Sequence, residues 1–352
     1  KEIKVEGVEV KAENGFLNFF LSMKAVRENL EKITKFFEKR RVIAIDYSSP
    51  NIAKPFSVGH LRSTVIGDSL RRIYEAMGHK VLWINFFGDW GMQFGKLLAA
   101  YELWGNERDI EKDPIRKLLE LYVKFHREAK RDPKLEEKAR EWLKRLEEKD
   151  KEAIKIWEKF KELSLKEFNK IYEILGVGTD YIYAGESLFY ESGKKLVEEL
   201  LEKGIAKVDE GAVIIPLEDL PPLLIRKKDG TTIYATRDLS SAIWRVKELG
   251  ADELIYVVGG EQRLYFKQLF AALDKVGIKV PKEHVWFGLV RLPEGKMSTR
   301  EGRVVFLEDV LNEAIERVKR IMKKRGIENE EIARKIGVGA IKFADLKNNR
   351  IR

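Results

Sequence analysis

The sequence predicts an α/β protein, a doubly wound parallel sheet of the Rossmann-like kind with a mostly helical insertion. Short apolar runs alternate with segments whose apolar residues recur at three- and four-residue steps, as expected of strands joined by crossover helices. A long, heavily charged stretch interrupts this alternation once, after which it resumes. No Gly-x-Gly-x-x-Gly follows a strand, and Gly91–Lys96 has the wrong spacing for a P-loop, so those two nucleotide motifs are excluded.

The first half of the sheet is predicted within residues 41–98. Val42–Tyr47 is a short apolar strand, and Val81–Phe86 is a second one. A loop with Pro and Gly over 48–59 leads into the helix between them, whose inward residues are Leu61, Val65, Leu70, Ile73 and Met77. A strand, a helix and a strand of this spacing form a right-handed unit with parallel strands.

Residues 99–228 are predicted to be a connective insertion. Its helical part, about Leu97–Leu175, nearly balances basic against acidic residues, as a solvated helical face does. The candidate buried stripe of these helices is Trp104, Leu118, Leu121, Trp142, Leu146, Ile154, Trp157, Phe160 and Leu163. Strands at Ala212–Ile215 and Leu223–Arg226 and a helix around Lys194–Glu202 complete the insertion.

The second half of the sheet is predicted within residues 229–292. Its elements are strand Thr232–Ala235, helix Leu239–Leu249, strand Leu254–Val258, helix Leu264–Val276 and strand Val285–Val290. Residues 1–40 end in a helical pattern at Val26, Leu30, Ile33, Phe36 and Phe37. Residues 293–352 hold a glycine-bracketed loop and a basic helical segment with Leu311, Ile315, Val318, Ile321 and Met322 on one face.

Composition excludes several classes of protein. The 352 residues are 44% hydrophobic and carry a net charge of +9, which favours a polyanionic partner. The absence of Cys excludes disulfides, thiolate catalysis and Cys-based zinc sites, and the four His residues are too scattered to suggest a metal site. The longest apolar patches, Phe16–Leu21 and Val81–Phe87, have the size of core segments and are too short for a membrane span. We expect a cytoplasmic monomer.

Polar residues recur where the predicted strands end. They are Asp46, Ser48, Asn51 and Lys54 after the first strand, Asn85, Gly88, Asp89 and Trp90 after the second, Tyr234 and Asp238 near the third, and Gly259, Gly260 and Gln262 after the fourth. Any single loop is polar, but ligands of open α/β sheets bind beyond the carboxyl ends of the strands. Four such sets together predict a binding site there.

Two segments could hold a nucleotide. Gly59 and His60 stand at a helix start for which Ser57 is a plausible N-cap, and the loop Gly295–Gly302 contains Lys296, Met297, Ser298 and Arg300. The alternative for His60 is a buried, hydrogen-bonded histidine, and the loop could be an ordinary basic turn. Their presence together, in this order on this fold, favours the nucleotide site.

These two elements, with Asp46–Phe56, Asn85–Gly95, Tyr234–Asp238 and Gln262–Gln268, resemble class I aminoacyl-tRNA synthetases and in particular the arginyl-tRNA synthetase family. The resemblance implies an arginine–tRNA ligase that activates L-arginine with ATP and transfers it to the terminal adenosine of tRNA(Arg). Residues 41–98 and 229–292 would be the two halves of the catalytic domain. Residues 1–40 would end an N-terminal additional domain, and 293–352 would lead to a missing anticodon-binding domain.

The resemblance also assigns site residues. Those expected to bind ATP are Ser57, Gly59, His60, Lys296, Met297, Ser298 and Arg300, with His60, Lys54 and Lys296 as catalytic residues. Those expected to bind arginine are Asp46, Asn51, Tyr234, Asp238 and Gln262, which offer the carboxylates, amide oxygens and aromatic wall that a planar guanidinium requires. We expect Mg²⁺ to accompany ATP, and no zinc or other protein-bound metal.

Alternatives stay open at this point. Ser57 and Thr299 stand where the family has a His and a second Lys, and Tyr265 stands where many relatives have His. Asp238 could cap its helix, and Asp46 could pair with Arg237 or another base. A small nucleotidyltransferase or amide ligase is a second reading of the function, although it gives no reason for the long insertion. A non-catalytic RNA-binding paralogue is a third.

Overall fold

A computed structural model describes residues 6–33, 40–290, 302 and 304–351. Its centre is a parallel sheet of five strands, as predicted. Across the sheet, in spatial order, the strands are β10 (Lys282–His284), β9 (Glu253–Tyr256), β3 (Val42–Asp46), β4 (Lys80–Asn85) and β5 (Ile182–Tyr183). The chain moves from β3 to β4 and β5 in one direction and to β9 and β10 in the other, so the sheet is doubly wound.

The two faces of the sheet are buried against different layers. In β3, Ile43 and Ile45 belong to one hydrophobic core, whereas Ala44 belongs to the other. In β9, Ile255 belongs to the first of these cores and Leu254 to the second. Successive side chains of a strand point to opposite faces, so a strand covered on both sides must be apolar throughout. Burial on both faces therefore explains the short, continuous apolar runs from which the strands were predicted.

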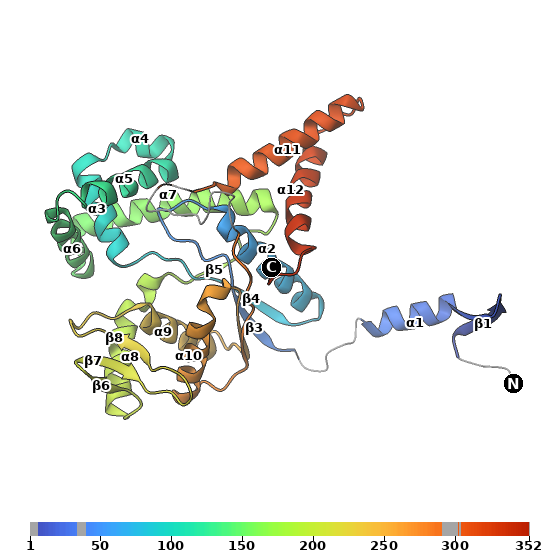
Figure 1. Ribbon diagram of the computed structural model, residues 1–352, viewed down its shortest axis with the longest axis horizontal. Helices are drawn as coiled ribbons and strands as arrows, with labels where there is room; N and C mark the ends of the chain where they lie inside the picture. The colour runs from blue at the N-terminus through green and yellow to red at the C-terminus, as the bar shows by residue number, and fades with distance from the viewer. Residues whose placement is uncertain (1–5, 34–39, 291–301, 303, 352) are drawn as a thin grey trace.

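One face is covered by α2 (Val58–Ala76) and by the predicted helical insertion (Figure 1). The insertion contains α3 (Met92–Trp104), α4 (Glu107–Lys112), α5 (Pro114–Glu128), α6 (Lys134–Glu147) and α7 (Lys151–Leu175). The predicted stripe packs inward: Leu118, Leu121, Trp142, Leu146, Trp157 and Phe160 are buried, and Trp104, Ile154 and Leu163 are partly buried against them.

The other face is covered by the rest of the chain's middle part. These elements are η1 (Glu186–Phe189), α8 (Tyr190–Glu202), α9 (Tyr234–Lys247), η2 (Gly260–Gln262), α10 (Arg263–Lys275) and a small antiparallel sheet of β6 (Lys207–Asp209), β7 (Ala212–Ile215) and β8 (Leu223–Arg226). The predicted strands Ala212–Ile215 and Leu223–Arg226 are confirmed.

Two predicted strands are wrong. Thr232–Ala235 is not a strand, because α9 begins at Tyr234 and Thr232 makes only an isolated bridge to Arg226. The buried residues Ala235, Leu239 and Ala242 recur at helical spacing, so the helical pattern extends further back than predicted. The strand placed at Val285–Val290 lies instead at Lys282–His284, because its partner β9 ends at Tyr256.

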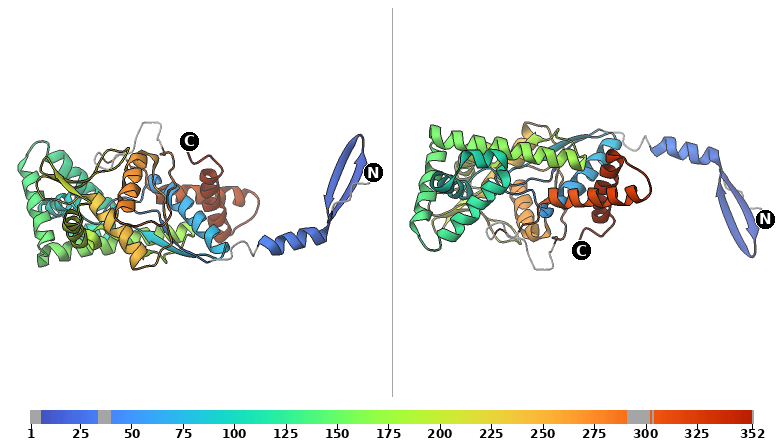
Figure 2. Two further views of the ribbon diagram at one scale, coloured as in Figure 1. Left: turned by 90° about the horizontal axis from the view of Figure 1, so that it is seen from below. Right: turned by 90° about the horizontal axis from the view of Figure 1, so that it is seen from above.

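At the N-terminal side, β1 (Val8–Glu13) and β2 (Phe16–Leu21) form a hairpin that is followed by α1 (Met23–Ile33). These elements stand away from the rest of the molecule in Figure 1 and in both views of Figure 2. The interpretation of Phe16–Leu21 as a core segment is wrong, because Phe16 is 72% exposed and an isolated two-stranded hairpin has no layer to bury it. Phe36 and Phe37 lie outside the described residues.

The C-terminal elements are α11 (Leu307–Lys324) and α12 (Glu330–Leu346), which pack against each other. Leu311 and Met322 are buried as predicted, but Ile321 is wrongly placed on that face, since it is 54% exposed. Across the described ranges, every helix is too short or too polar to cross a membrane.

Candidate functional site

The polar residues predicted to meet at the sheet edge lie around the point where the strand order reverses, between β3 and β9. There the backbone N–H of Val257 donates to the carbonyl oxygen of Asp46 over 2.8 Å. Ser63 of α2 donates its hydroxyl to the carbonyl of Val257 over 2.6 Å and accepts from the backbone N–H of Ser48 over 2.9 Å. The first turns of α2 are thereby fastened to both strands, at the position where open α/β sheets bind ligands.

The loop after β3 has an unusual backbone. Ser48, Ser49 and Ala53 have φ values of 72°, 45° and 59°, in the left-handed region that non-glycine residues seldom adopt. Side chains from elsewhere hold them there: Asn85 accepts from the N–H of Ser49 over 2.9 Å, and Ser164 accepts from that of Ala53, also over 2.9 Å. Such strain persists only where the surroundings impose it and is concentrated at functional sites.

Asp46 forms a buried ion pair with Arg245, a residue of α9. The carboxylate and a guanidinium nitrogen are 2.6 Å apart, and the other carboxylate oxygen accepts from the hydroxyl of Ser49 over 2.7 Å. Both oxygens of Asp46 are therefore engaged with the protein. The sequence alternative that Asp46 pairs with a base thus occurs here, with Arg245 as the base rather than Arg237.

Asp238, one turn into α9, has a different environment. The hydroxyl of Tyr265 donates a hydrogen bond to its carboxylate, and within the described ranges no Lys or Arg forms an ion pair with it. Burial, together with the nearby carboxylates of Glu186 and Asp46, raises the pKa of Asp238 to about 7. Its position inside the helix, after four earlier helical residues, excludes the role of N-cap.

Glu186 is a site residue that the sequence interpretation missed. It accepts a hydrogen bond from Arg237 over 2.8 Å, and burial raises its pKa. It follows β5, so it stands at the carboxyl end of a strand like the predicted residues. β5 has only two residues, Ile182 and Tyr183, which is too short for a recognisable apolar run. Polar residues at the carboxyl ends of strands were the site candidates, so Glu186 would have been among them had this strand been recognised.

Asp89 fixes the segment that carries Glu186. This carboxylate is fully buried and accepts from the backbone N–H of Ser187 over 2.8 Å and from the hydroxyls of Ser187 and Tyr183 over 2.6 and 2.5 Å. Burial raises its pKa. Gly185 lies so close that a Cβ there would be 2.2 Å from a carboxylate oxygen of Asp89. Asp89, predicted as a loop residue after the second strand, thus positions η1.

The remaining predicted arginine-site residues have different environments. Tyr234 is 53% exposed and its ring contacts that of Tyr265 edge-on at 5.0 Å. Asn51 lies against Gly88, where a Cβ would be 1.9 Å from the Asn51 amide oxygen, so only glycine leaves room for this side chain. Gln262 ends η2 at the start of α10 and is exposed.

His60 is the third residue of α2, at the start of the helix as predicted, with Ser57 as the N-cap residue. The backbone N–H of Ser57 donates to Nδ1 of His60 over 3.1 Å, so Nδ1 is the acceptor and the neutral ring carries its proton on Nε2. Burial, with a smaller contribution from the charge of Lys54, lowers the pKa of His60 to about 4. At neutral pH this imidazole is therefore uncharged and offers a single N–H donor from Nε2.

Lys54 stands between the two groups of residues. Its charge lowers both the pKa of His60 and the pKa of Glu186, and its Nζ lies 5.3 Å from the ring centre of Tyr122 in α5. Gly59 is the second residue of α2, next to His60. The charge of Lys54 thus acts on the imidazole of His60, and its catalytic role remains a prediction.

The residues predicted in the loop 293–302, namely Lys296, Met297, Ser298, Thr299 and Arg300, lie outside the described residues. The chain that follows the loop is described and runs beside the start of α2. The N–H of Val58 donates to the carbonyl of Val305 over 3.1 Å, and the N–H of Leu307 donates to that of Phe56 over 3.0 Å.

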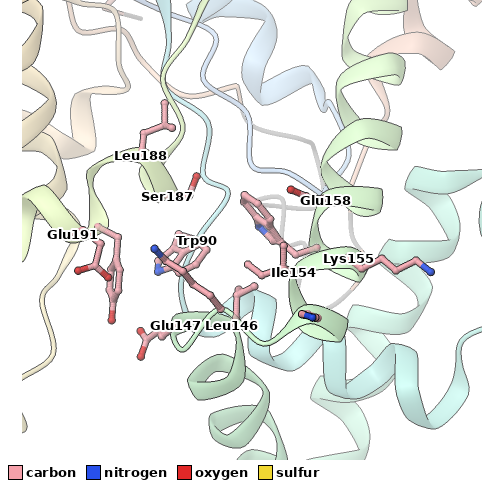
Figure 3. A pocket seen from close by; sticks show the side chains of 13 residues that line it. Trp90, Leu146, Glu147, Ile154, Lys155, Glu158, Ser187, Leu188 and Glu191 are labelled. Atoms are coloured by element: carbon pink, nitrogen blue, oxygen red, sulfur yellow. The ribbon is translucent and has the colours of Figure 1, made fainter.

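A cavity of about 570 Å³ lies between the helical insertion and the η1–α8 segment (Figure 3), and Ser187, which binds Asp89, is part of its lining. Trp90 is the one residue of the predicted carboxyl-end sets that lines it, and none of the predicted arginine or ATP residues does. Among the side chains that the structure describes, no group of three or more His, Asp or Glu residues converges as a metal site.

Comparison with known proteins gives a consistent result. Residues 23–352 match the family model described as tRNA synthetases class I (R), catalytic domain. The chain is similar to an arginine–tRNA ligase from Exiguobacterium sibiricum, with 46% identity over 97% of this chain and 64% of that relative. It is also similar to one from Clostridioides difficile, with 45% identity over 96% of this chain and 62% of that relative. The chain thus spans a little under two thirds of the length of these curated relatives.

Solved structures show the same fold. The arginyl-tRNA synthetase of Plasmodium falciparum superposes with a TM-score of 0.76 at 27% identity, covering 99% of this chain and 63% of that one. That of Thermus thermophilus superposes with a TM-score of 0.79 at 24% identity, covering 99% and 66%, and supports the fold alone.

Proposed function

Because this chain belongs to the family of class I tRNA synthetases (R), catalytic domain, we propose that it activates L-arginine with ATP and transfers the arginyl group to the terminal adenosine of tRNA(Arg). The chain covers a little under two thirds of its relatives, so the activity of the whole protein is part of the proposal. We retain with it the predicted division into two catalytic halves, 41–98 and 229–292, the insertion 99–228, and the flanking segments 1–40 and 293–352.

The observation that carries the proposal is the carboxylate of Asp238, which forms no ion pair with any residue that the structure describes. Asp46 is paired with Arg245 and Glu186 with Arg237, whereas Asp238 accepts from the hydroxyl of Tyr265, and the charge of Arg245 acts on it without a direct ion pair. A buried carboxylate without a cation is costly, which its raised pKa expresses. The guanidinium of a bound arginine would supply the missing charge and five N–H donors in a planar fork. This favours arginine over an uncharged amino acid.

The other predicted residues complete an arginine site in this proposal. Glu186 adds a second carboxylate near Asp238, and Tyr234 offers an aromatic face to the cation. Asn51 and Gln262 contribute amide groups to the polar ends of the amino acid. Asp46 acts through Arg245, because both of its oxygens are already engaged.

The ATP side is built around the start of α2. His60 donates from Nε2 toward the phosphates as a neutral group, so positive charge comes from Lys54 and the helix N-terminus rather than from the imidazole. Ser57 and Gly59 lie under the nucleotide in this proposal, and Lys296, Met297, Ser298 and Arg300 contribute from the loop. Mg²⁺ would enter with the ATP phosphates and neutralise their charge.

In the first step the carboxylate of arginine attacks the α-phosphorus of ATP, and pyrophosphate departs with the electron pair of the broken P–O bond. In the second step a hydroxyl of the terminal adenosine attacks the arginyl carbonyl, and AMP leaves. Neither step needs a nucleophile from the protein, so the residues position the reactants and neutralise developing charge. We propose that the protein does this as a cytoplasmic monomer with tRNA(Arg), L-arginine and ATP as its partners.

Adenylate formation tests the proposal directly. We expect pyrophosphate exchange with arginine and tRNA(Arg) present, little with lysine, and none above background with citrulline, which has the shape of arginine without its charge. Exchange with arginine that is independent of tRNA would favour a small adenylylating ligase instead. No ATP turnover with any of these substrates would favour the non-catalytic paralogue.

A further inference from the structure

The helical insertion contacts both ends of Lys54. This residue lies four positions before the start of α2, and its charge lowers the pKa of His60 on the nucleotide side and that of Glu186 on the arginine side. A side chain of α7 binds the backbone that leads into Lys54, and a side chain of α5 meets its ammonium. Both helices belong to the insertion, so Lys54 is the point at which the insertion reaches the proposed site.

Ser164 of α7 fixes the backbone before Lys54. Its hydroxyl oxygen accepts from the N–H of Ala53 over 2.9 Å and donates its own hydrogen to the carbonyl of Phe160 over 2.6 Å. Ala53 has a φ of 59°, in the left-handed region that a residue with a Cβ seldom adopts. Ser164 and Ala53 are both buried, so without the serine oxygen this N–H would lose its partner away from water. The hydroxyl therefore stabilises the turn from which the Lys54 side chain starts.

Tyr122 of α5 meets the other end of this side chain. The ammonium nitrogen of Lys54 lies 5.3 Å from the centre of the Tyr122 ring. The face of an aromatic ring attracts a cation within about 6 Å, and the attraction is stronger where water is excluded. Tyr122 is buried and Lys54 is partly buried. The ring of His126 contacts that of Tyr122 edge-on at 4.6 Å, so the tyrosine ring is itself held in place.

A separate contact fixes α5 against the start of α2. The guanidinium of Arg116 lies 4.0 Å from the ring centre of Phe306 and donates to both carboxylate oxygens of Asp309 over 2.8 and 3.0 Å. Phe306 forms a bridge with Ser57, the N-cap residue of α2. Tyr122 therefore stands on a helix that is fastened to the nucleotide side through other residues, as a side chain that orients Lys54 requires.

A second lysine contacts a ring of α5 without any connection to the site. The ammonium of Lys96 lies 5.8 Å from the ring centre of Phe125 and pairs with the carboxylate of Glu136 over 2.7 Å. Those three residues belong to α3, α5 and α6, so their contacts join helices of the insertion to one another. The contact between Tyr122 and Lys54 instead joins the insertion to the loop after β3. Phe125 therefore provides the comparison for a ring whose role is packing.

We propose that Tyr122 and Ser164 are positioning residues for Lys54, which hold its ammonium where the nucleotide and the bound arginine meet. The inference rests on the proposed function, in which Lys54 supplies positive charge to adenylate formation. A lysine side chain is flexible, so fixing it costs conformational entropy. Contacts that fix it before the reaction allow the ammonium to stabilise the charge that develops at the α-phosphate without first being reoriented. The insertion thereby takes part in the first step.

Double-mutant cycles test this dependence on Lys54. Pyrophosphate exchange is measured with saturating arginine, ATP and tRNA(Arg). We expect Tyr122→Leu to lower the rate about 2- to 30-fold, the range of a cation–π contact, and Ser164→Ala to lower it about 2- to 10-fold, the range of one hydrogen bond. In a Lys54→Met chain neither substitution should lower the rate further. Losses of the same size in both backgrounds would show a structural role alone and overturn the inference.

Two further variants separate the ring face from packing. Tyr122→Phe keeps the face over which the ammonium lies and should retain the parental rate within about twofold. Phe125→Leu removes a ring at a fully buried position of the same helix, so we expect it to lower the stability and leave the rate unchanged. Circular dichroism checks that each variant is folded. A loss of rate in Tyr122→Phe or Phe125→Leu as large as that in Tyr122→Leu would overturn the inference.

A measurement without turnover distinguishes this inference from the proposed function. Protons over the face of an aromatic ring resonate upfield, so in a chain with isotope-labelled lysine we expect an upfield displacement of the ε-methylene signal of Lys54, assigned by its loss in Lys54→Met. Tyr122→Phe should keep the displacement and Tyr122→Leu should remove it. A displaced signal in a parent chain without pyrophosphate exchange would contradict the proposed function and with it the catalytic part of the inference. Exchange without a displaced signal would overturn the inference alone.

Discussion

The hydroxyl of Tyr265 donates a hydrogen bond to the carboxylate of Asp238. Among the residues that the structure describes, Tyr265 is the side chain that hydrogen-bonds to this carboxylate. The two residues belong to successive helices, α10 and α9, and each lies near the start of its helix. Tyrosine can orient the carboxylate but cannot neutralise it. This environment supports the contact to the guanidinium of arginine that we propose for Asp238.

Replacing Asp238 by Asn tests this charge. Loss of a charge-assisted contact to a guanidinium costs about 1.5–3 kcal/mol, so we expect the affinity for arginine to fall roughly 10- to 150-fold. Affinity for ATP should change by less than about twofold, because Asp238 is not among the residues proposed to contact ATP and distant sites act independently. Calorimetric titration with each ligand measures both. A loss of the same size for ATP would contradict the assignment. Tyr265→Phe serves as the matched control, since it removes the orienting bond and keeps the charge.

The raised pKa of Asp238 predicts a pH dependence. Because burial raises this pKa from the ordinary carboxyl value to about 7, the free protein holds a proton there at pH 5 to 6 that arginine binding must displace. We expect the affinity for arginine to rise about tenfold per pH unit up to pH 7 and then to level off. Asp238→Asn should abolish the slope.

The raised pKa of Asp238 also determines whether the free energy of unfolding rises or falls with pH. Between about pH 4 and pH 7 the folded state binds this proton more tightly than the unfolded state, so its contribution to the free energy of unfolding falls as pH rises through that window. The stability of Asp238→Asn relative to that of the parent chain should therefore be higher at pH 8 than at pH 5. Urea unfolding at the two pH values measures the difference, and a difference of opposite sign would refute the raised pKa.

His60 is expected to act through Nε2 and not through charge. His60→Ala should lower the rate of adenylate formation by about 10²- to 10⁴-fold, the range for loss of a positioned catalytic group, with the fold intact. His60→Gln, which keeps an N–H₂ near the Nε2 position, should retain more activity than His60→Asn. Because the pKa of His60 is lowered to about 4, its titration should leave the rate flat between pH 6 and 8. Equal rates for the Gln and Asn variants would argue against the Nε2 donor.

Gly88→Ala tests the placement of Asn51. A Cβ at position 88 would lie 1.9 Å from the amide oxygen of Asn51, so this side chain or the backbone must move. We expect weaker arginine binding and a loss of stability of about 1–3 kcal/mol from overpacking. Gly339→Ala is the control, because nothing lies within 4 Å of its Cβ position in α12. It should be neutral or stabilising by up to about 1 kcal/mol. Arginine affinity that is unchanged in Gly88→Ala would remove Asn51 from the site.

Arg245→Met tests the buried pair with Asp46. Removing one partner leaves an uncompensated buried charge, so we expect a loss of about 3–5 kcal/mol in the free energy of unfolding. Arg317 forms a pair with Glu313 at 2.7 Å on the surface of α11, and Arg317→Met should cost less than about 1 kcal/mol. Denaturant unfolding compares the two variants. A cost for Arg245→Met as small as that for Arg317→Met would show that the buried pair is not required.

Much of the fold could be predicted because hydrophobic periodicity is local. The strands that became β3, β4 and β9 are buried on both faces, and their apolar runs are visible in the sequence. The prediction of a strand at Thr232–Ala235 was wrong because a short apolar run at the start of a helix is too short to show helical periodicity. β5 was missed because two residues that pair with β4 carry no local pattern.

The sequence by itself determined which residues stand at the carboxyl ends of the longer strands and that His60 opens a helix capped by Ser57. Each of these depends on spacing along the chain. Only the tertiary structure decided which acids are neutralised, because Asp46 and Arg245 are 199 positions apart and Glu186 meets Arg237 from a different element. Charge pairing depends on distances through space, which no local period encodes. For that reason Asp238, the carboxylate that we propose binds arginine, could be distinguished from its neighbours only in the folded chain.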